Sequence, residues 1–241
     1  MTGWEFLPAN KGSTLGRDDI PQFHVLAGYH PAPRKGTNMA IKAVVFDIGG
    51  VLEITPNLGV DEKWEKHLNR KPGEFNELLR DVWRGGSLGT ISIEQVHQQI
   101  RERLGLSESV VNEYMADIWK EYLGTLNVEL AEYFRSLRPT YQTAIISNSF
   151  VGAREKEAEY YQFDAICDFI IYSHEVGLSK PDLRIFALAC ERLGVKPNEI
   201  IFVDNHKEVY VSAQEMGMHC IEFRDNAQVI ADIETCIRAN S

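Results

Sequence analysis

Residues 43–54 read AVVFDIGGVLEI, a stretch in which an apolar run gives way to an acid and two glycines. Residues 43–46 are short, apolar and partly β-branched, which is typical of a strand buried on both faces. Asp47 follows where such a strand reaches the surface, and Gly49 and Gly50 let the backbone turn sharply or approach a ligand closely. By itself this pattern fits a strand-end Asp that caps a turn as well as an acid in a functional site.

Beyond residue 127 the sequence alternates between helical and strand patterns. Short apolar strands are predicted at residues 142–147, 168–173, 199–204 and 219–223, with amphipathic helices before, between and after them. Such alternation is typical of a parallel sheet that helices cover on both faces. We therefore expect an α/β fold with a doubly wound, Rossmann-like parallel-sheet core.

A long helical block separates the first strand from this alternating region. Between about residues 60 and 125, apolar residues recur at three- and four-residue spacing. Ser92 and Ser107 are predicted helix N-caps, and Gly105 and Gly124 are predicted helix ends. We interpret the block as an inserted α-helical cap domain.

These patterns divide the chain into three parts. Residues 1–38 are rich in Pro and Gly and lack periodicity, so we expect a poorly ordered N-terminal extension. The α/β core is predicted at residues 39–58 and 127–241, and the helical cap at residues 59–126.

The composition limits the partners and the location of the protein. The formal net charge is −10, which offers no basic footprint for nucleic acid and argues against anionic membranes. No apolar run approaches the roughly 20 residues of a transmembrane helix, and the N-terminus lacks the apolar core of a secretory signal. Four cysteines without metal-site spacing are expected to be reduced thiols of a cytoplasmic protein: Cys167, Cys190, Cys220 and Cys236.

Polar residues end three of the predicted strands. In an open parallel sheet the ligand site lies outside the carboxyl ends of the strands, so these residues should converge. They are Asp47, Ser147 with Asn148, and Asp204 with Asn205, and Lys180 follows the sequence VGLS nearby.

This set of residue types suits phosphoryl transfer. A carboxylate can attack a phosphate and form an aspartyl-phosphate. Mg²⁺ held by one or two carboxylates neutralises phosphate charge, and Asp47 and Asp204 are candidates for that role. Lys180 is a compact cation suited to a phosphate or to the nucleophile, and Ser147 with nearby N–H groups can hold phosphate oxygens.

Four stretches in this order resemble the motifs of the haloacid dehalogenase superfamily of hydrolases: VVFDIGGVL, AIISNS, GLSKPD and IIFVDN. The separations also match, with 100 residues between Asp47 and Ser147 and 24 between Lys180 and Asp204. The resemblance covers about residues 41–223 and implies the fold of that superfamily.

The resemblance also implies roles for individual residues. Asp47 would be the nucleophile and a Mg²⁺ ligand, with the Gly49 carbonyl as a second ligand and Asp204 completing the protein contacts. Lys180 would screen charge.

Other implied roles concern the phosphate and the substrate. Ser147 and Asn148 would bind phosphate, and Gly49 and Gly50 would bring the backbone up to it. Within the cap, WRGGSLGT at residues 83–90 is predicted to be a substrate-facing loop, which makes Trp83 and Arg84 candidate substrate contacts.

The sequence departs from the superfamily pattern at two positions. Gly49 stands where phosphatases usually carry a second Asp, the general acid, whose loss costs about 10²–10⁴ in rate. Glu53 and His97 are candidate substitutes for that acid. Asn205 stands where a further acid is common, and it can still orient a metal-bound water. Glu208 is a possible source of the missing negative charge. Because Asn205 replaces an acid, we expect magnesium binding to be weakened.

Three functions remain open at this stage. The first is a Mg²⁺-dependent phosphatase of small phosphorylated metabolites. The second is a metal-free 2-haloacid dehalogenase, which Gly49 fits but Asp204 does not, because a second acid would repel the substrate carboxylate. The third is an attenuated member that binds a phosphorylated ligand or a protein without turnover. The substrate is not encoded in any residue pattern, and both a monomer and a homodimer remain open.

Overall fold

The computed structural model describes residues 40–240 of the 241-residue chain. The predicted N-terminal extension, residues 1–38, lies outside the described residues. Within the described part, no helix combines the length and the apolar character that crossing a membrane requires.

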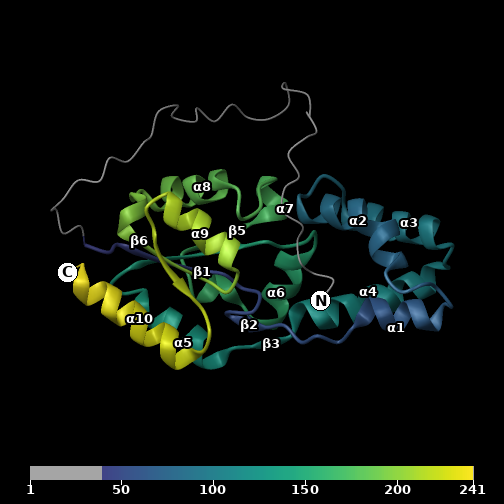
Figure 1. Ribbon diagram of the computed structural model, residues 1–241, viewed down its shortest axis with the longest axis horizontal. Coiled ribbons are helices and arrows are strands. Elements are labelled where there is room, and N and C mark those ends of the chain that lie inside the picture. Colours follow the sequence, from purple (N-terminus) through teal and green to yellow (C-terminus); the bar gives the residue numbers. More distant parts are fainter. Residues whose placement is uncertain (1–39, 241) are drawn as a thin grey trace, which may run out of the picture.

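The centre of the molecule is a five-stranded parallel sheet (Figure 1). Its strands lie in the order β5, β4, β1, β6, β7, and every neighbouring pair is parallel. The bounds are Phe169–Tyr172 for β5, Gln142–Ser147 for β4, Ala43–Phe46 for β1, Ile200–Asp204 for β6 and His219–Glu222 for β7. The sequence order reverses at β1, where β4 and β6 lie on either side of it. The predicted doubly wound α/β fold is confirmed.

Alternate residues of each strand enter two separate cores. Val44 and Phe46 of β1 face one core, where the ring of Phe46 stacks on that of Phe134 at 4.5 Å. Ala43 and Val45 face the other core. The helices α5 (Val128–Leu137) and α10 (Asn226–Ala239) cover the first face, and α8 (Leu183–Leu193) and α9 (Lys207–Glu215) cover the second. Burial on both faces explains why the strands have continuous apolar sequences.

Four further helices form the cap, which extends to one side of the sheet (Figure 1). They are α1 (Val60–His67), α2 (Glu74–Ser87), α3 (Ile93–Leu104) and α4 (Glu108–Leu123). The cap has its own apolar core, and it joins the sheet through two antiparallel strands, β2 (Glu53–Ile54) and β3 (Thr125–Leu126). The structure confirms the N-caps at Ser92 and Ser107, and α3 and α4 end at the predicted glycines.

One element of the cap differs from the prediction. Most of the segment at residues 83–90 is not a loop, because α2 continues through Ser87 and only residues 88–90 turn. Gly86 is needed inside the helix, since a Cβ there would lie 2.1 Å from a ring atom of Phe150. Gly89 has a φ of +65°, and its Cβ would lie 1.8 Å from the carbonyl oxygen of His174. These glycines therefore let the cap pack closely against the core instead of forming a flexible loop.

Two shorter helices connect the sheet to this contact surface. They are α6 (Ala153–Tyr160), which follows β4, and α7 (Ser173–Val176), which follows β5. The end of α2 packs on α7, so the cap lies against the same edge of the sheet at which β4 and β5 end.

Candidate active site

The carboxyl ends of β1 and β6 bring two acids and a lysine together. Asp47 directly follows β1, Asp204 ends β6, and Lys180 lies in the loop between α7 and α8. The Lys180 Nζ lies 2.7 Å from Asp47 Oδ1 and 2.7 Å from Asp204 Oδ2. All three side chains are buried. The structure thus brings together the three charged residues that the sequence singled out.

The buried charges alter the pKa of each member of the cluster. Burial raises the pKa of Asp47 to about 6, although the charge of Lys180 opposes this shift. Burial acts in the same direction on Asp204, but Lys180 and the neighbouring His206 hold the pKa of Asp204 below its usual range. Burial also disfavours the charged lysine, yet the two carboxylates together raise the pKa of Lys180. The cluster therefore has one cation for two acids.

Asn205 lies against the glycine turn that follows β1. Gly50 has a φ of +73°, and a Cβ there would lie 2.4 Å from Asn205 Nδ2, so only glycine fits this position. The buried Asn205 Oδ1 accepts no hydrogen bond from any described residue. A buried acceptor without a donor is unusual in a folded protein, and a cation is one partner that satisfies it.

The donor set fits a divalent cation. One oxygen each of Asp47 and Asp204 and one ring nitrogen of His206 all lie within 4.8 Å of one another. The amide oxygen of Asn205 is the unsatisfied acceptor beside them. Carboxylate and amide oxygens are the ligands that Mg²⁺ prefers, and the excess negative charge of the cluster favours a cation.

Asn148 supports the loop that carries Lys180. Its Nδ2 donates to the Lys180 carbonyl at 2.8 Å, and its Oδ1 accepts from the Lys180 backbone N–H at 2.7 Å. Both ends of the amide are therefore engaged in positioning the lysine, a role that the sequence did not indicate. Ser147 is buried at the end of β4, at the same edge of the sheet.

The two predicted cap residues, Trp83 and Arg84, both lie on α2. The half-buried ring of Trp83 packs at 6.3 Å from that of Tyr114 and at 5.6 Å from that of Phe150, so it belongs to the apolar contact between cap and core. Arg84 is exposed on α2. The predicted substrate contacts of Trp83 and Arg84 therefore stay predictions.

The candidate substitutes for the missing general acid lie in different places. Glu53 is buried at the cap linker, where it accepts a hydrogen bond from the Thr55 hydroxyl at 2.7 Å, and burial raises the pKa of Glu53 to about 8. His97 is half-buried on α3, and this helix lies in the part of the cap away from the sheet (Figure 1). Glu208, the possible source of the negative charge that Asn205 lacks, is exposed in the first turn of α9.

A polar junction that the sequence did not reveal holds the cap against the core. The Ser173 hydroxyl donates to the carbonyl of Ser87 at the end of α2, at 2.8 Å. The backbone N–H of Val151 donates to the carbonyl of Gly86 at 3.1 Å. Both contacts involve segments directly after β4 and β5, so the cap is closed against the edge of the sheet that carries the site.

A second junction surrounds a buried acid. Glu157, on α6, accepts hydrogen bonds from the hydroxyls of Tyr122 at 3.2 Å and Tyr172 at 2.7 Å. Tyr122 belongs to α4 of the cap, and Tyr172 ends β5. Burial raises the pKa of Glu157 to about 7 in spite of these donors. The sequence AREKEAEY gives no sign that this acid is buried.

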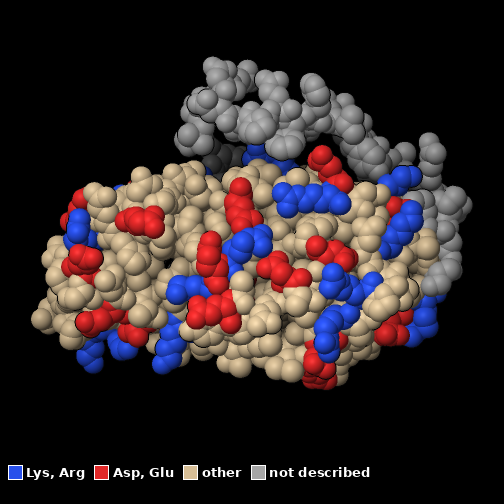
Figure 2. Space-filling view, turned by 180° about the vertical axis from the view of Figure 1, so that it is seen from behind, with Lys and Arg blue, Asp and Glu red and all other residues tan. Residues whose placement is uncertain are grey.

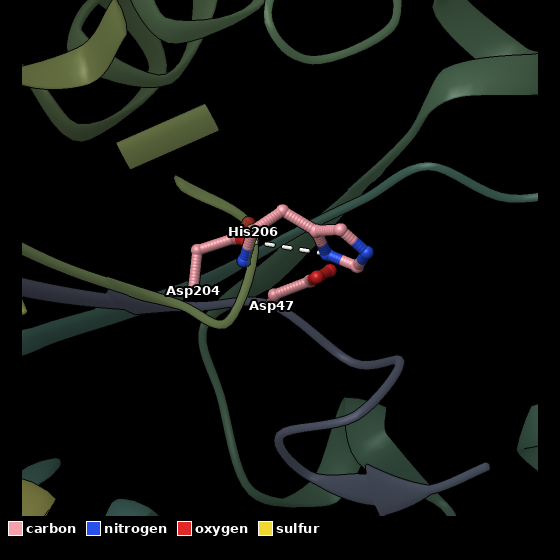
Figure 3. Close-up of side chains that lie close together, drawn as sticks. All are labelled: Asp47, Asp204 and His206. Atoms are coloured by element: carbon pink, nitrogen blue, oxygen red, sulfur yellow. Dashed lines mark hydrogen bonds and ion pairs between the residues drawn. The ribbon is translucent and has the colours of Figure 1, made fainter. Parts of the chain in front are cut away.

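His206 reaches the charged cluster from the start of α9. Figure 3 shows its ring beside the carboxylates of Asp47 and Asp204. The His206 Nδ1 lies 3.7 Å from Asp204 Oδ1, and its backbone N–H donates to the same oxygen at 2.8 Å. The neighbouring carboxylate of Asp204 raises the pKa of His206. Its side chain is 56% exposed.

Known proteins are similar to this chain in both sequence and fold. The sequence model of the haloacid dehalogenase-like hydrolases matches residues 41–217. The chain is 27% identical over 224 residues to bifunctional epoxide hydrolase 2 of Rattus norvegicus, a match that covers 81% of this chain and 39% of that protein. It is 26% identical over 204 residues to a sesquiterpene phosphatase of Aspergillus oryzae, covering 81% of this chain and 96% of the phosphatase. The chain thus spans well under half the length of the epoxide hydrolase.

Among solved structures, a haloacid dehalogenase family enzyme of Bacteroides thetaiotaomicron superposes with a TM-score of 0.69 at 22% identity, covering 79% of this chain and 98% of that one. The same enzyme in complex with magnesium and inorganic phosphate superposes with a TM-score of 0.63 at 21% identity, covering 78% and 98%. Because the family match extends over most of the chain and the folds agree, the protein is a hydrolase of the haloacid dehalogenase-like family.

Proposed function

We propose that this hydrolase removes the phosphoryl group from small phosphorylated metabolites, with Asp47 as nucleophile and Mg²⁺ as cofactor. The observation that carries the proposal is the buried cluster of Asp47, Asp204 and Lys180, which has one cation for two acids and an unsatisfied amide oxygen beside it. The similarity to a phosphatase and the magnesium and phosphate bound by the Bacteroides enzyme support this choice.

The two oxygens of Asp47 have different surroundings. Oδ1 accepts hydrogen bonds from the Ile48 backbone N–H and from Lys180, both at 2.7 Å. These bonds fix the carboxylate, and Oδ2 is the oxygen proposed to attack phosphorus. The new bond from Asp47 to phosphorus forms as the bond to the leaving oxygen breaks. Water then attacks phosphorus, which releases phosphate and restores the carboxylate.

The metal would be held by the carboxylates of Asp47 and Asp204 and the Gly49 carbonyl, with Asn205 contributing its amide oxygen. A bound Mg²⁺ supplies charge neutralisation for the phosphoryl group. Lys180 adds a second positive charge at the same carboxylates, and the backbone at Ser147 and Gly50 is proposed to hold phosphate oxygens.

Gly49 limits the class of substrate. No side chain at this position can protonate the leaving oxygen, so esters of poor leaving groups are expected to react slowly. We therefore propose phosphates with good leaving groups, such as acyl and aryl phosphates, as the favoured class.

A metal-free dehalogenase is the less favoured alternative. Its substrate carries a carboxylate, which the buried Asp204 and Asp47 would repel together. A divalent cation balances the same charges.

The proposed partner is a small molecule and not a nucleic acid. The net charge of −10 supports this, and on the face in Figure 2 acidic and basic side chains are interspersed.

A substrate screen tests this proposal. Purified protein is assayed for phosphate release from acyl, aryl, sugar and nucleoside phosphates, and for halide release from 2-haloacids, each with Mg²⁺ and with a chelator. We expect phosphate release that requires Mg²⁺. Halide release that is insensitive to the chelator, without phosphate release, would replace the phosphatase with the dehalogenase.

A further inference from the structure

His206 lies beside the proposed metal site. It is the N-cap residue of α9, and its backbone is fixed by the hydrogen bond from its N–H to Asp204 Oδ1. Together with Lys207, Glu208 and Val211 it lines a shallow surface depression. The imidazole is half-exposed and lies beside the buried carboxylates (Figure 3).

We propose that His206 is a nitrogen ligand of the metal that Asp47 and Asp204 hold, and that it makes the site bind Co²⁺ and Zn²⁺ through a contact that Mg²⁺ does not use. The three ligand atoms already lie within 4.8 Å of one another, and the ring that carries the nitrogen is half-exposed. The inference rests on the metal site of the proposed function, but not on the phosphatase reaction.

The chemistry of the donors sets the metal preference. Imidazole suits Zn²⁺, Ni²⁺ and Co²⁺, whereas Mg²⁺ takes oxygen ligands and retains water. Affinity for a mixed nitrogen and oxygen site rises from Mn²⁺ to Co²⁺ and beyond. Asn205 offers a neutral amide in place of an acid, so a nitrogen donor also compensates for weaker oxygen ligation at this site.

Lys180 does not compete for the position of the imidazole. Its Nζ binds Asp204 through Oδ2, whereas His206 faces Oδ1 of the same carboxylate. Oδ2 of Asp204 therefore contacts Lys180, and Oδ1 faces His206. Asp47 likewise gives Oδ1 to Lys180.

Metal binding without substrate tests the inference. Calorimetric titrations with Co²⁺ and with Mg²⁺ are made on untagged wild-type protein, on His206→Ala and on the control Lys207→Ala. Lys207 is the exposed neighbour on the same helix. We expect His206→Ala to weaken Co²⁺ binding at least about tenfold and Mg²⁺ binding less than about threefold. Lys207→Ala should change neither.

Spectroscopy supplies an independent readout. In the Co²⁺-loaded protein, pulsed electron paramagnetic resonance should show coupling to an imidazole ¹⁴N that is lost in His206→Ala. Equal Co²⁺ affinity in wild type and His206→Ala, or no nitrogen coupling, would overturn the role of His206 while leaving the metal site intact. Failure of every ion to bind would overturn both the inference and the proposed metal site.

Discussion

Replacing Glu157 by glutamine removes an acid that the fold buries between the cap and the sheet. Its side chain accepts hydrogen bonds from Tyr122 and Tyr172. Burial nevertheless raises the pKa of Glu157 from 4.5 to about 7, so the folded protein binds this proton more tightly than the unfolded chain does. Glu157→Gln keeps the shape of the side chain and removes its titration.

The sign of the effect follows from the raised pKa. When an acid has a higher pKa in the folded state, the folded state binds more protons, and stability falls as pH rises. For Glu157 the loss begins near pH 4.5 and is complete above about pH 7. The difference between the two pKa values corresponds to about 3 kcal/mol, of which about 2–3 kcal/mol falls between pH 5 and pH 8.

Urea denaturation at pH 5 and pH 8 measures this contribution. Wild type and Glu157→Gln are compared with Glu159→Gln, which removes an exposed acid from the same helix. Relative to wild type, Glu157→Gln should be about 2–3 kcal/mol more stable at pH 8 than at pH 5. Glu159→Gln should show the same pH dependence as wild type. The reasoning is refuted if Glu157→Gln also follows the wild-type pH profile.

Three further substitutions test the glycine turn after β1, the charged cluster around Lys180 and the missing general acid. Gly50→Ala places a Cβ at a φ of +73°, 2.4 Å from Asn205 Nδ2, and should cost at least about 1–2 kcal/mol in urea denaturation. Gly49→Ala, whose nearest contact is 4.0 Å away, is the matched control, and an equal cost would contradict this account of the turn. Lys180→Met leaves two buried carboxylates unpaired and should lower stability by about 3–5 kcal/mol at pH 7. The exposed control Lys196→Met should be neutral, and similar losses in both would exclude the ion pairs as the cause. Gly49→Asp should raise kcat for alkyl phosphates more than for aryl phosphates, because it restores a proton donor for poor leaving groups. Equal changes in kcat for both substrates would show that the added Asp does not act as a proton donor to the leaving group.

The sheet could be predicted from the sequence because its signals are local. Continuous apolar runs mark strands buried on both faces, and the predicted strands match β4, β5, β6 and β7 to within about one residue at most ends. The charged cluster was also predictable, since parallel strands end at one edge of the sheet. This is why Asp47 and Asp204 lie together at that edge.

The contacts between cap and core could not be predicted in the same way. They depend on residues far apart in sequence, such as Gly86 against Phe150, where the helix needs a glycine that a local pattern assigns to a loop. Glu157 lies in a strongly polar helix, and only the fold places two tyrosines over it. His206 is exposed, and only the turn after β6 places its ring beside Asp47.

Trapping the reaction on Asp47 tests the central claim most directly. The protein is mixed with Mg²⁺ and the best substrate of the screen, quenched in acid within a turnover, and its peptides are analysed by mass spectrometry. We expect a phosphoryl group on the peptide that contains Asp47, and Asp47→Asn should lose both this adduct and turnover, because an amide cannot attack phosphorus. A phosphoryl group on another residue, or turnover that persists in purified Asp47→Asn, would contradict Asp47 as the nucleophile.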